Sequence, residues 1–78
     1  MKRYTISIFT ENFIGLLNRV SIIFTRRHLN IESITASESE VKDVYRYTIV
    51  LTTTEEQVLK VVRQLEKIVD VLKAFYHT

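Results

Sequence analysis

The 78-residue chain contains no cysteine, no proline and one glycine, Gly15. Without cysteine, the chain has neither disulfides nor a thiolate metal site, so packing and self-association are left to stabilise a small domain. The absence of cysteine also fits a reducing cytoplasm, which is the location that we expect. The lack of proline and of low-complexity sequence predicts a single domain over residues 1–78.

Long apolar runs and an excess of one charge are also missing. The apolar stretches are far shorter than the roughly 20 residues of a membrane span, and the N-terminus enters a strand pattern directly, without a signal peptide. Eleven Lys and Arg stand against nine Asp and Glu. The run Arg26-Arg27-His28 is typical of a helix C-terminus, where cations complement the dipole. These features argue against membrane and nucleic-acid binding.

Catalytic motifs are scarce as well. Neither His28 nor His77 has a carboxylate at a metal-ligand spacing, and no G-x-S-x-G accompanies the serines. One glycine is too few for a P-loop or a dinucleotide-binding turn. The acidic cluster at 38–43 is typical of a solvated turn. The sequence therefore predicts no catalytic residue and no metal site, and favours a binding or regulatory module.

Hydrophobic periodicity predicts the order of elements. Alternation predicts half-buried strands at 4–9 and 45–51. An apolar stripe predicts a helix from near Leu16, and capping-box spacing places the start of a second helix at Thr53 or Thr54. Further strands are expected at 30–37 and 69–76. The apolar stripes consist of Leu16, Leu17, Val20, Ile23 and Phe24, and of Val58, Val61, Val62, Leu65 and Ile68.

The order β-α-β-β-α-β predicts an α+β, ferredoxin-like fold: a four-stranded antiparallel sheet with two helices on one face. The second strand lies at a sheet edge and is polar and unprotected, so we expect it to pair with a second copy across a twofold axis. The other sheet face is open. By period, it carries polar Thr5, Ser7, Arg46 and Thr48, together with Phe9, Val44 and Val50. These three form either a contact patch or scattered surface residues, and we favour the second.

The run from Glu11 to Gly15 is the strongest candidate site. It joins the first strand to the first helix, where glycine permits a positive φ or a close approach. Backbone N–H groups and the positive end of a helix dipole can hold a carboxylate there. Asn12 lies three residues before Gly15, and Asn30 opens the second strand at the opposite end of the unit. Pairing of two copies would bring one copy's Asn30 near the other's Asn12. The alternative is that Asn12 caps the helix and Asn30 shapes a turn.

Several segments together carry a family resemblance. They are Glu11-Asn12-x-x-Gly15-x-Leu17-x-Arg19-Val20, Phe24-x-x-Arg27, Asn30-Ile31-Glu32-Ser33, Arg46-x-Thr48-Ile49 and Val69-Asp70-Val71-Leu72. With these segments the whole chain resembles the ACT domain of the small, regulatory subunit of acetolactate synthase (acetohydroxyacid synthase).

The resemblance implies a non-catalytic subunit that binds the large catalytic subunit and confers feedback inhibition by a branched-chain amino acid, usually valine. It implies a homodimer through the second-strand edge and no cofactor in this chain, while the family's catalytic subunit uses thiamine diphosphate, Mg and FAD. Asn12, Gly15 and Asn30 would hold the amino acid's charged groups. The apolar residues that would enclose its side chain are Phe13, Ile14, Leu16 and Ile31.

Two departures from the family pattern stand out. His28 occupies a position where relatives commonly carry glycine, and a positive φ there would strain it. Family subunits usually continue into a C-terminal domain, whereas this chain stops at Thr78, so we expect an excised domain or a naturally short form.

Three alternatives share the fold. One is an ACT amino-acid sensor of another enzyme. The second is an RNA-binding domain, which stacks bases on open-face aromatics, whereas Tyr4 and Tyr47 here fall on the core side. The third is an acyl-phosphate hydrolase, whose anion cradle would be opposed by Glu11.

Overall fold

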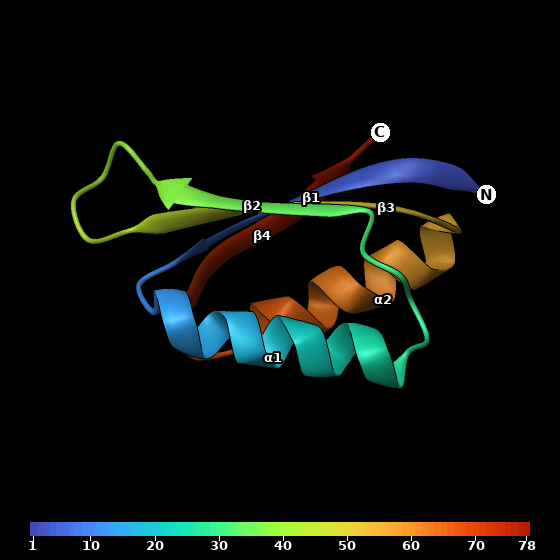
Figure 1. Ribbon diagram of the computed structural model, residues 1–78, viewed down its shortest axis with the longest axis horizontal. Coiled ribbons are helices and arrows are strands. Elements are labelled where there is room, and N and C mark those ends of the chain that lie inside the picture. The colour runs from blue at the N-terminus through green and yellow to red at the C-terminus, as the bar shows by residue number, and fades with distance from the viewer.

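The computed structural model describes residues 1–78, except for the side chain of Phe13. The elements follow in the order β1 (Lys2–Thr10), α1 (Phe13–Arg26), β2 (Ser33–Glu38), β3 (Tyr45–Thr53), α2 (Glu55–Glu66) and β4 (Val71–His77). The strands form one antiparallel sheet in the order β2-β3-β1-β4, with both helices against one face (Figure 1). The predicted ferredoxin-like fold is confirmed, and β2 is an edge strand as expected.

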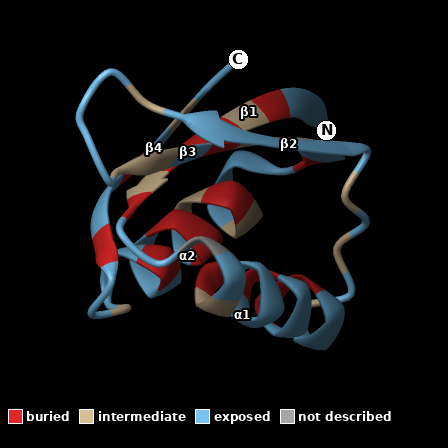
Figure 2. Ribbon diagram, turned by 60° about the vertical axis from the view of Figure 1, so that its left-hand side comes forward, coloured by how far each residue is buried: buried red, intermediate tan, exposed pale blue. Residues whose placement is uncertain are grey.

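The core lies between the sheet and the helices (Figure 2). In the central pair of strands, Ile6 lies opposite Ile49 and Ile8 lies opposite Tyr47, and all four side chains are buried. Directly paired residues share a face, so this register places the apolar sets of both strands under the helices. Most of the two predicted helical stripes fills the other side, with Leu16, Val20, Ile23 and Phe24 from α1 and Val58, Val61, Val62 and Leu65 from α2 buried. Two predicted members differ, since Leu17 is 41% exposed and Ile68 lies beyond the end of α2, half-buried.

The start of α1 differs from the prediction. The helix begins at Phe13 rather than near Leu16, because the extended Asn12 caps it and accepts the Gly15 N–H through Oδ1 at 2.9 Å. Gly15 therefore lies in the first helical turn. Its φ is not positive, so of the two roles that glycine could have here, a positive φ or a close approach, the structure shows the close approach.

The first helix ends just before His28, the position where relatives of the family commonly carry glycine. This residue has φ 57°, its N–H donates to the Thr25 carbonyl at 3.1 Å, and the Leu29 N–H donates to the Phe24 carbonyl at 2.9 Å. This pair of bonds is a Schellman motif with histidine at the left-handed position. The predicted positive φ is confirmed, and so is the assignment of Arg26 to a helix C-terminus.

The second helix begins at the second of its two predicted caps. Thr54 accepts the Gln57 N–H through Oγ1 at 3.2 Å, whereas Thr53 ends β3 and is buried. Thr53 faces the core because the alternation of β3 continues through it.

Two strands begin later than predicted. β2 begins at Ser33 and not at Asn30, since the chain leaving α1 first places Leu29 and Ile31 against the core. β4 begins at Val71 and not at Val69, because a turn in which the Val71 N–H donates to the Ile68 carbonyl at 3.0 Å follows α2.

Side chains on the open face contact one another, whereas scattered surface residues were favoured from the sequence. Ser7 lies on it but is fully buried, since the Arg46 side chain reaches over and donates to Ser7 Oγ at 3.4 Å. Phe9 stacks on Phe75 with ring centroids 6.4 Å apart, and Arg46 and Lys73 lie over the two rings. Phe9 therefore belongs to a cation-capped aromatic pair. In the described part of the chain, neither helix is long and apolar enough to cross a membrane.

Candidate functional site

The candidate site is a corner where β1, the start of α1 and the start of β4 meet. Thr10 Oγ1 donates to the Asp70 carbonyl at 2.9 Å and accepts the Asn12 N–H at 3.1 Å. Asn12 Nδ2 donates to Asp70 Oδ2 at 3.2 Å, while its Oδ1 accepts the Gly15 N–H. Both ends of the Asn12 amide are therefore held, and its orientation is set by two elements distant in sequence.

This arrangement requires glycine at position 15, because the Asn12 amide leaves no space there for a side chain. A Cβ atom built at Gly15 would lie 2.5 Å from Asn12 Nδ2 and 2.8 Å from Asn12 Oδ1. A Cβ atom does not approach a non-bonded heavy atom this closely, so any other residue would displace the Asn12 amide. The glycine is thus explained by close approach and not by backbone freedom.

The electrostatics of the corner favour a zwitterion. No acidic residue lies in the first turn of α1, so the positive end of the helix dipole is not offset from within the helix. The Asp70 carboxylate stands beside it and offers an acceptor for an ammonium group. Because Gly15 N–H is already bonded to Asn12 Oδ1, a ligand carboxylate at this N–H must share or displace that bond.

Asn30 lies far from this corner in the same chain. It is exposed in the loop after α1, and Figure 1 shows this loop at the other end of the helix. With 14 residues in α1, the separation is about 21 Å at the usual rise of 1.5 Å per residue. The predicted placement at opposite ends is confirmed, and one chain does not bring Asn12 and Asn30 together.

The apolar residues of the predicted site also have different places. Leu16 is 1% exposed and belongs to the core, whereas Ile14 is 73% exposed on α1. Ile31 is half-buried against the core near Asn30. The Phe13 side chain lies outside the described residues, so its predicted role has no structural test here.

Glu32 anchors the loop that carries Asn30 and Ile31. Its carboxylate accepts from Arg3 Nη2 at 2.8 Å and Arg3 Nε at 3.2 Å, and also from Thr52 Oγ1. The Thr52 hydrogen bond, followed by the Arg3 hydrogen bonds, lowers the pKa of Glu32. This connection ties the loop before β2 to β1 and β3, and so orients the segment 30–32.

Sequence reasoning missed the roles of Asp70 and Glu32. Both lie within segments that carry the family resemblance, but their partners are distant in the chain: Asp70 contacts Asn12, and Glu32 contacts Arg3. Only the pairing of the strands brings these groups together. Among the described residues, no three His, Asp or Glu side chains gather as metal ligands.

The sequence of this chain is similar to those of known proteins. A family model described as "AHAS small subunit-like ACT domain" matches residues 6–73. The chain is 38% identical over 72 residues to the acetolactate synthase small subunit of Mycobacterium bovis, covering 92% of this chain and 43% of that protein. It is 39% identical over 71 residues to the probable acetolactate synthase small subunit of Archaeoglobus fulgidus, covering 91% of this chain and 45% of the relative.

Solved structures give the same result for the fold. The acetolactate synthase small subunit from Thermotoga maritima superposes with a TM-score of 0.85 at 29% identity, over 97% of this chain and 47% of that one. The ACT domain from the GTP pyrophosphokinase of Chlorobium tepidum has a TM-score of 0.76 at 14% identity, over 97% of both chains. The second likeness shows the fold alone. The chain spans less than half the length of the small subunits that it matches.

Proposed function

Because this chain belongs to the family of AHAS small subunit-like ACT domains, we propose that it is a regulatory unit of acetolactate synthase that binds a branched-chain amino acid. The proposed effector is valine, and the proposed outcome is feedback control of branched-chain amino-acid synthesis through the catalytic subunit. The family, whose curated members are small subunits, agrees with the expectation of a domain that is not itself an enzyme. Thiamine diphosphate, Mg and FAD are then cofactors of the partner, and the expected cytoplasmic location stays a prediction.

The proposal includes a dimer through β2. Every residue of β2 is exposed, and Ile34 is 37% exposed although it lies opposite the buried Ile49 on the helix side of the sheet. An edge of this kind offers free backbone groups and a partly exposed apolar side chain to another strand. Pairing with a second copy would satisfy both, and would extend the sheet to twice its width.

The direction of β2 supports a composite effector site. β2 runs from the Asn30 end of the domain toward the Asn12 end, opposite to α1 (Figure 1). A twofold axis makes the two β2 strands antiparallel, so the start of one lies near the end of the other. The Asn30 segment of one protomer would then approach the Asn12 corner of its partner.

In this composite site each group has a chemical role. The Gly15 N–H and the start of α1 favour the effector carboxylate, while the Asn12 and Asn30 side-chain oxygens and Asp70 accept from the ammonium. Ile31 of the second protomer and Ile14 of the first supply apolar surface. A preference for valine over alanine follows from burial of its two extra carbons, at roughly 0.8 kcal/mol per methylene.

The observation that carries the proposal is the contact between Asn12 and Gly15. Because Gly15 has no side chain, the Asn12 amide can lie against the first turn of α1 and accept the Gly15 N–H. The chain that has this contact belongs to the family of AHAS small subunit-like ACT domains.

Complementation between two variants tests the composite site. We expect calorimetry to detect valine binding to the wild type and to find none for Asn12→Ala or Asn30→Ala alone. If the site uses Asn12 from one protomer and Asn30 from the other, mixed and re-equilibrated variants regain about a quarter of the sites, since a heterodimer holds one intact site. A mixture that stays silent while the wild type binds valine contradicts a shared site. Absence of heat from the wild type with valine, leucine and isoleucine contradicts the effector proposal as a whole.

One observation favours the alternative of RNA binding. Tyr4 and Tyr47 are buried, as predicted, but Phe9 and Phe75 form a stacked pair on the open face. Bases stack on such aromatics in RNA-binding domains of this topology. A salt-sensitive gel shift with single-stranded RNA that is lost in Phe75→Ala would support this function, and the same assay without a shift excludes it.

A further inference from the structure

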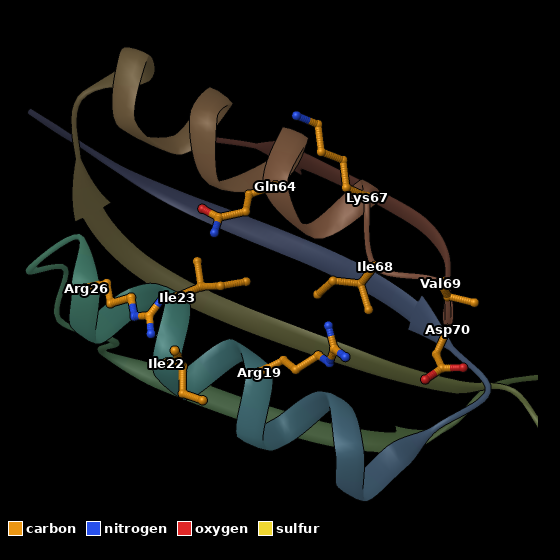
Figure 3. Close-up of a pocket in the computed structure, with 9 residues that line it drawn as sticks. All are labelled: Arg19, Ile22, Ile23, Arg26, Gln64, Lys67, Ile68, Val69 and Asp70. Carbon is orange, nitrogen blue, oxygen red and sulfur yellow. The ribbon is translucent and has the colours of Figure 1, made fainter.

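A groove of about 600 Å³ runs between α1 and the end of α2 (Figure 3). Its apolar lining consists of Ile22 and Ile23 from α1 and of Ile68 and Val69 from the turn after α2. Ile22 is 50% exposed and Val69 is 95% exposed. Aliphatic side chains left open in a concave surface mark an interaction site more often than an ordinary stretch of surface does.

The rim of the groove is basic. Arg19, Arg26 and Lys67 line it, against a single carboxylate, Asp70. None of these three cations has an ion-pair partner among the described side chains, and Asp70 accepts a hydrogen bond from Asn12. Arg26 complements the C-terminus of α1, but Arg19 lies in mid-helix and extends into the space between the helices (Figure 3). The groove thus presents uncompensated positive charge around an apolar floor.

The groove is separate from the proposed dimer edge. It lies in the helix layer between α1 and α2, whereas β2 lies at the edge of the sheet opposite β4, the strand that α2 contacts. A dimer formed through β2 therefore leaves the groove of each protomer open.

We propose that this groove docks a partner-protein segment in which carboxylates flank an aliphatic side chain. The inference rests on the proposed function, in which that partner is the catalytic subunit of acetolactate synthase. The aliphatic side chain fills the space beside Ile22 and Val69, and the carboxylates meet Arg19 and Lys67. Apolar burial supplies affinity, and the basic rim supplies orientation and a salt-dependent association rate.

A second copy of this chain is the other occupant to consider. The β2–β3 loop carries Glu38, Glu40 and Asp43 around exposed Val41, which matches the same chemistry. Insertion of this loop into a neighbour's groove is a head-to-tail contact, and such contacts extend into open chains unless the rotation closes. The observations therefore favour a different protein.

The test measures binding of the 78-residue chain to the purified acetolactate synthase large subunit of the same organism. Arg19→Glu combined with Lys67→Glu reverses the rim, and both side chains are exposed, so the fold is retained; circular dichroism checks this. We expect this double variant to bind the large subunit at least about tenfold more weakly than the wild type, with a flatter salt dependence. Val69→Ser is expected to weaken binding without changing the salt dependence.

The matched control is Lys2→Glu combined with Lys42→Glu, which changes the net charge equally at exposed sites outside the groove. This control is expected to retain binding to the large subunit. Equal loss in both double variants, or no binding by the wild type, overturns the inference. Concentration-dependent growth of wild-type assemblies that the rim reversal abolishes identifies a second copy as occupant, and also overturns it. Valine calorimetry on the same samples reports separately on the proposed effector site.

Discussion

At the start of α1 a single hydrogen atom in place of a methyl group keeps the Asn12 amide in position. The amide is held between the Gly15 N–H and the Asp70 carboxylate. The same contact stabilises the helix as a cap and orients a polar group toward the corner. Substitutions here separate stability from binding, because the two depend on different parts of the contact.

Gly15→Ala is expected to change stability little and to abolish effector binding. Moving Asn12 away removes a cap worth about 1 kcal/mol, while alanine is favoured over glycine in a helix by about the same amount. The two terms nearly cancel. The Asn12 amide nevertheless leaves its place, since the new Cβ would lie 2.5 Å from its nitrogen. Urea unfolding and valine calorimetry measure the two effects.

Asn18→Ala is the control, because it changes an exposed residue of α1 outside the corner. It should bind valine as the wild type does. Normal valine binding by Gly15→Ala would contradict the claim that effector binding needs the Asn12 amide in its observed orientation.

His28→Gly is expected to stabilise the chain by roughly 1 kcal/mol. His28 has φ 57° at the left-handed position of the Schellman motif, where glycine pays no steric penalty. His28→Ala keeps a Cβ and should show no such gain. Denaturant titration of the three proteins decides the matter, and equal stability of the glycine and alanine variants would contradict backbone strain at this residue.

Among the elements, β2 matters most for the proposed dimer. Its sequence gives little apolar surface of its own, and its one aliphatic residue beyond alanine, Ile34, is 37% exposed. The strand is held to the sheet only through β3. Its free edge and the partly exposed Ile34 are consistent with a position between two protomers.

Ile34→Lys is expected to convert the dimer into a monomer, because a charge would replace apolar surface at the shared edge. Valine binding should be lost with it, since the composite site needs both protomers. Sedimentation velocity reports the oligomeric state. The control is Leu72→Lys, which should remain dimeric. Leu72 is 53% exposed and lies on β4, the strand at the opposite edge of the sheet. Dimers in both variants would place the interface elsewhere.

For the whole molecule, the contact of Glu32 with Arg3 and Thr52 joins the loop after α1 to the two central strands. These partners lower the pKa of Glu32 below its ordinary value of 4.5. The ionised carboxylate therefore contributes stability above that ordinary value, and the contribution is lost as the pH falls through the lower folded-state pKa.

Glu32→Gln is accordingly expected to be less stable than the wild type at neutral pH, with a difference that shrinks in acid. Thermal unfolding from pH 7 down to pH 3 measures this. Glu66→Gln, at an exposed carboxylate at the end of α2, is the matched control for the change from carboxylate to amide. A constant difference for Glu32→Gln across that range would contradict the assigned role of its ionised form.

Local patterns were sufficient for most of the elements. Alternation in β1 and β3, the helical stripes, and capping at Thr54 all act between near neighbours in the chain, so the order of elements and the buried faces followed from them. The predictions were wrong where a distant contact decided the boundary. β2 begins later because Leu29 and Ile31 first pack on the core. The earlier start of α1 is a local effect, since the Asn12 side chain caps the helix at Gly15, which the sequence allowed as an alternative.

The sequence alone determined the fold and the edge position of β2, because both follow from the periodicity and order of the elements, and the family resemblance marked His28 as a position where relatives commonly carry glycine. The tertiary structure decided the rest. It brought Asp70 to Asn12, Arg3 to Glu32 and Phe75 to Phe9, and it opened a basic groove between α1 and α2. These contacts join residues far apart in the chain, and strand register and helix placement, not local preference, set their distances.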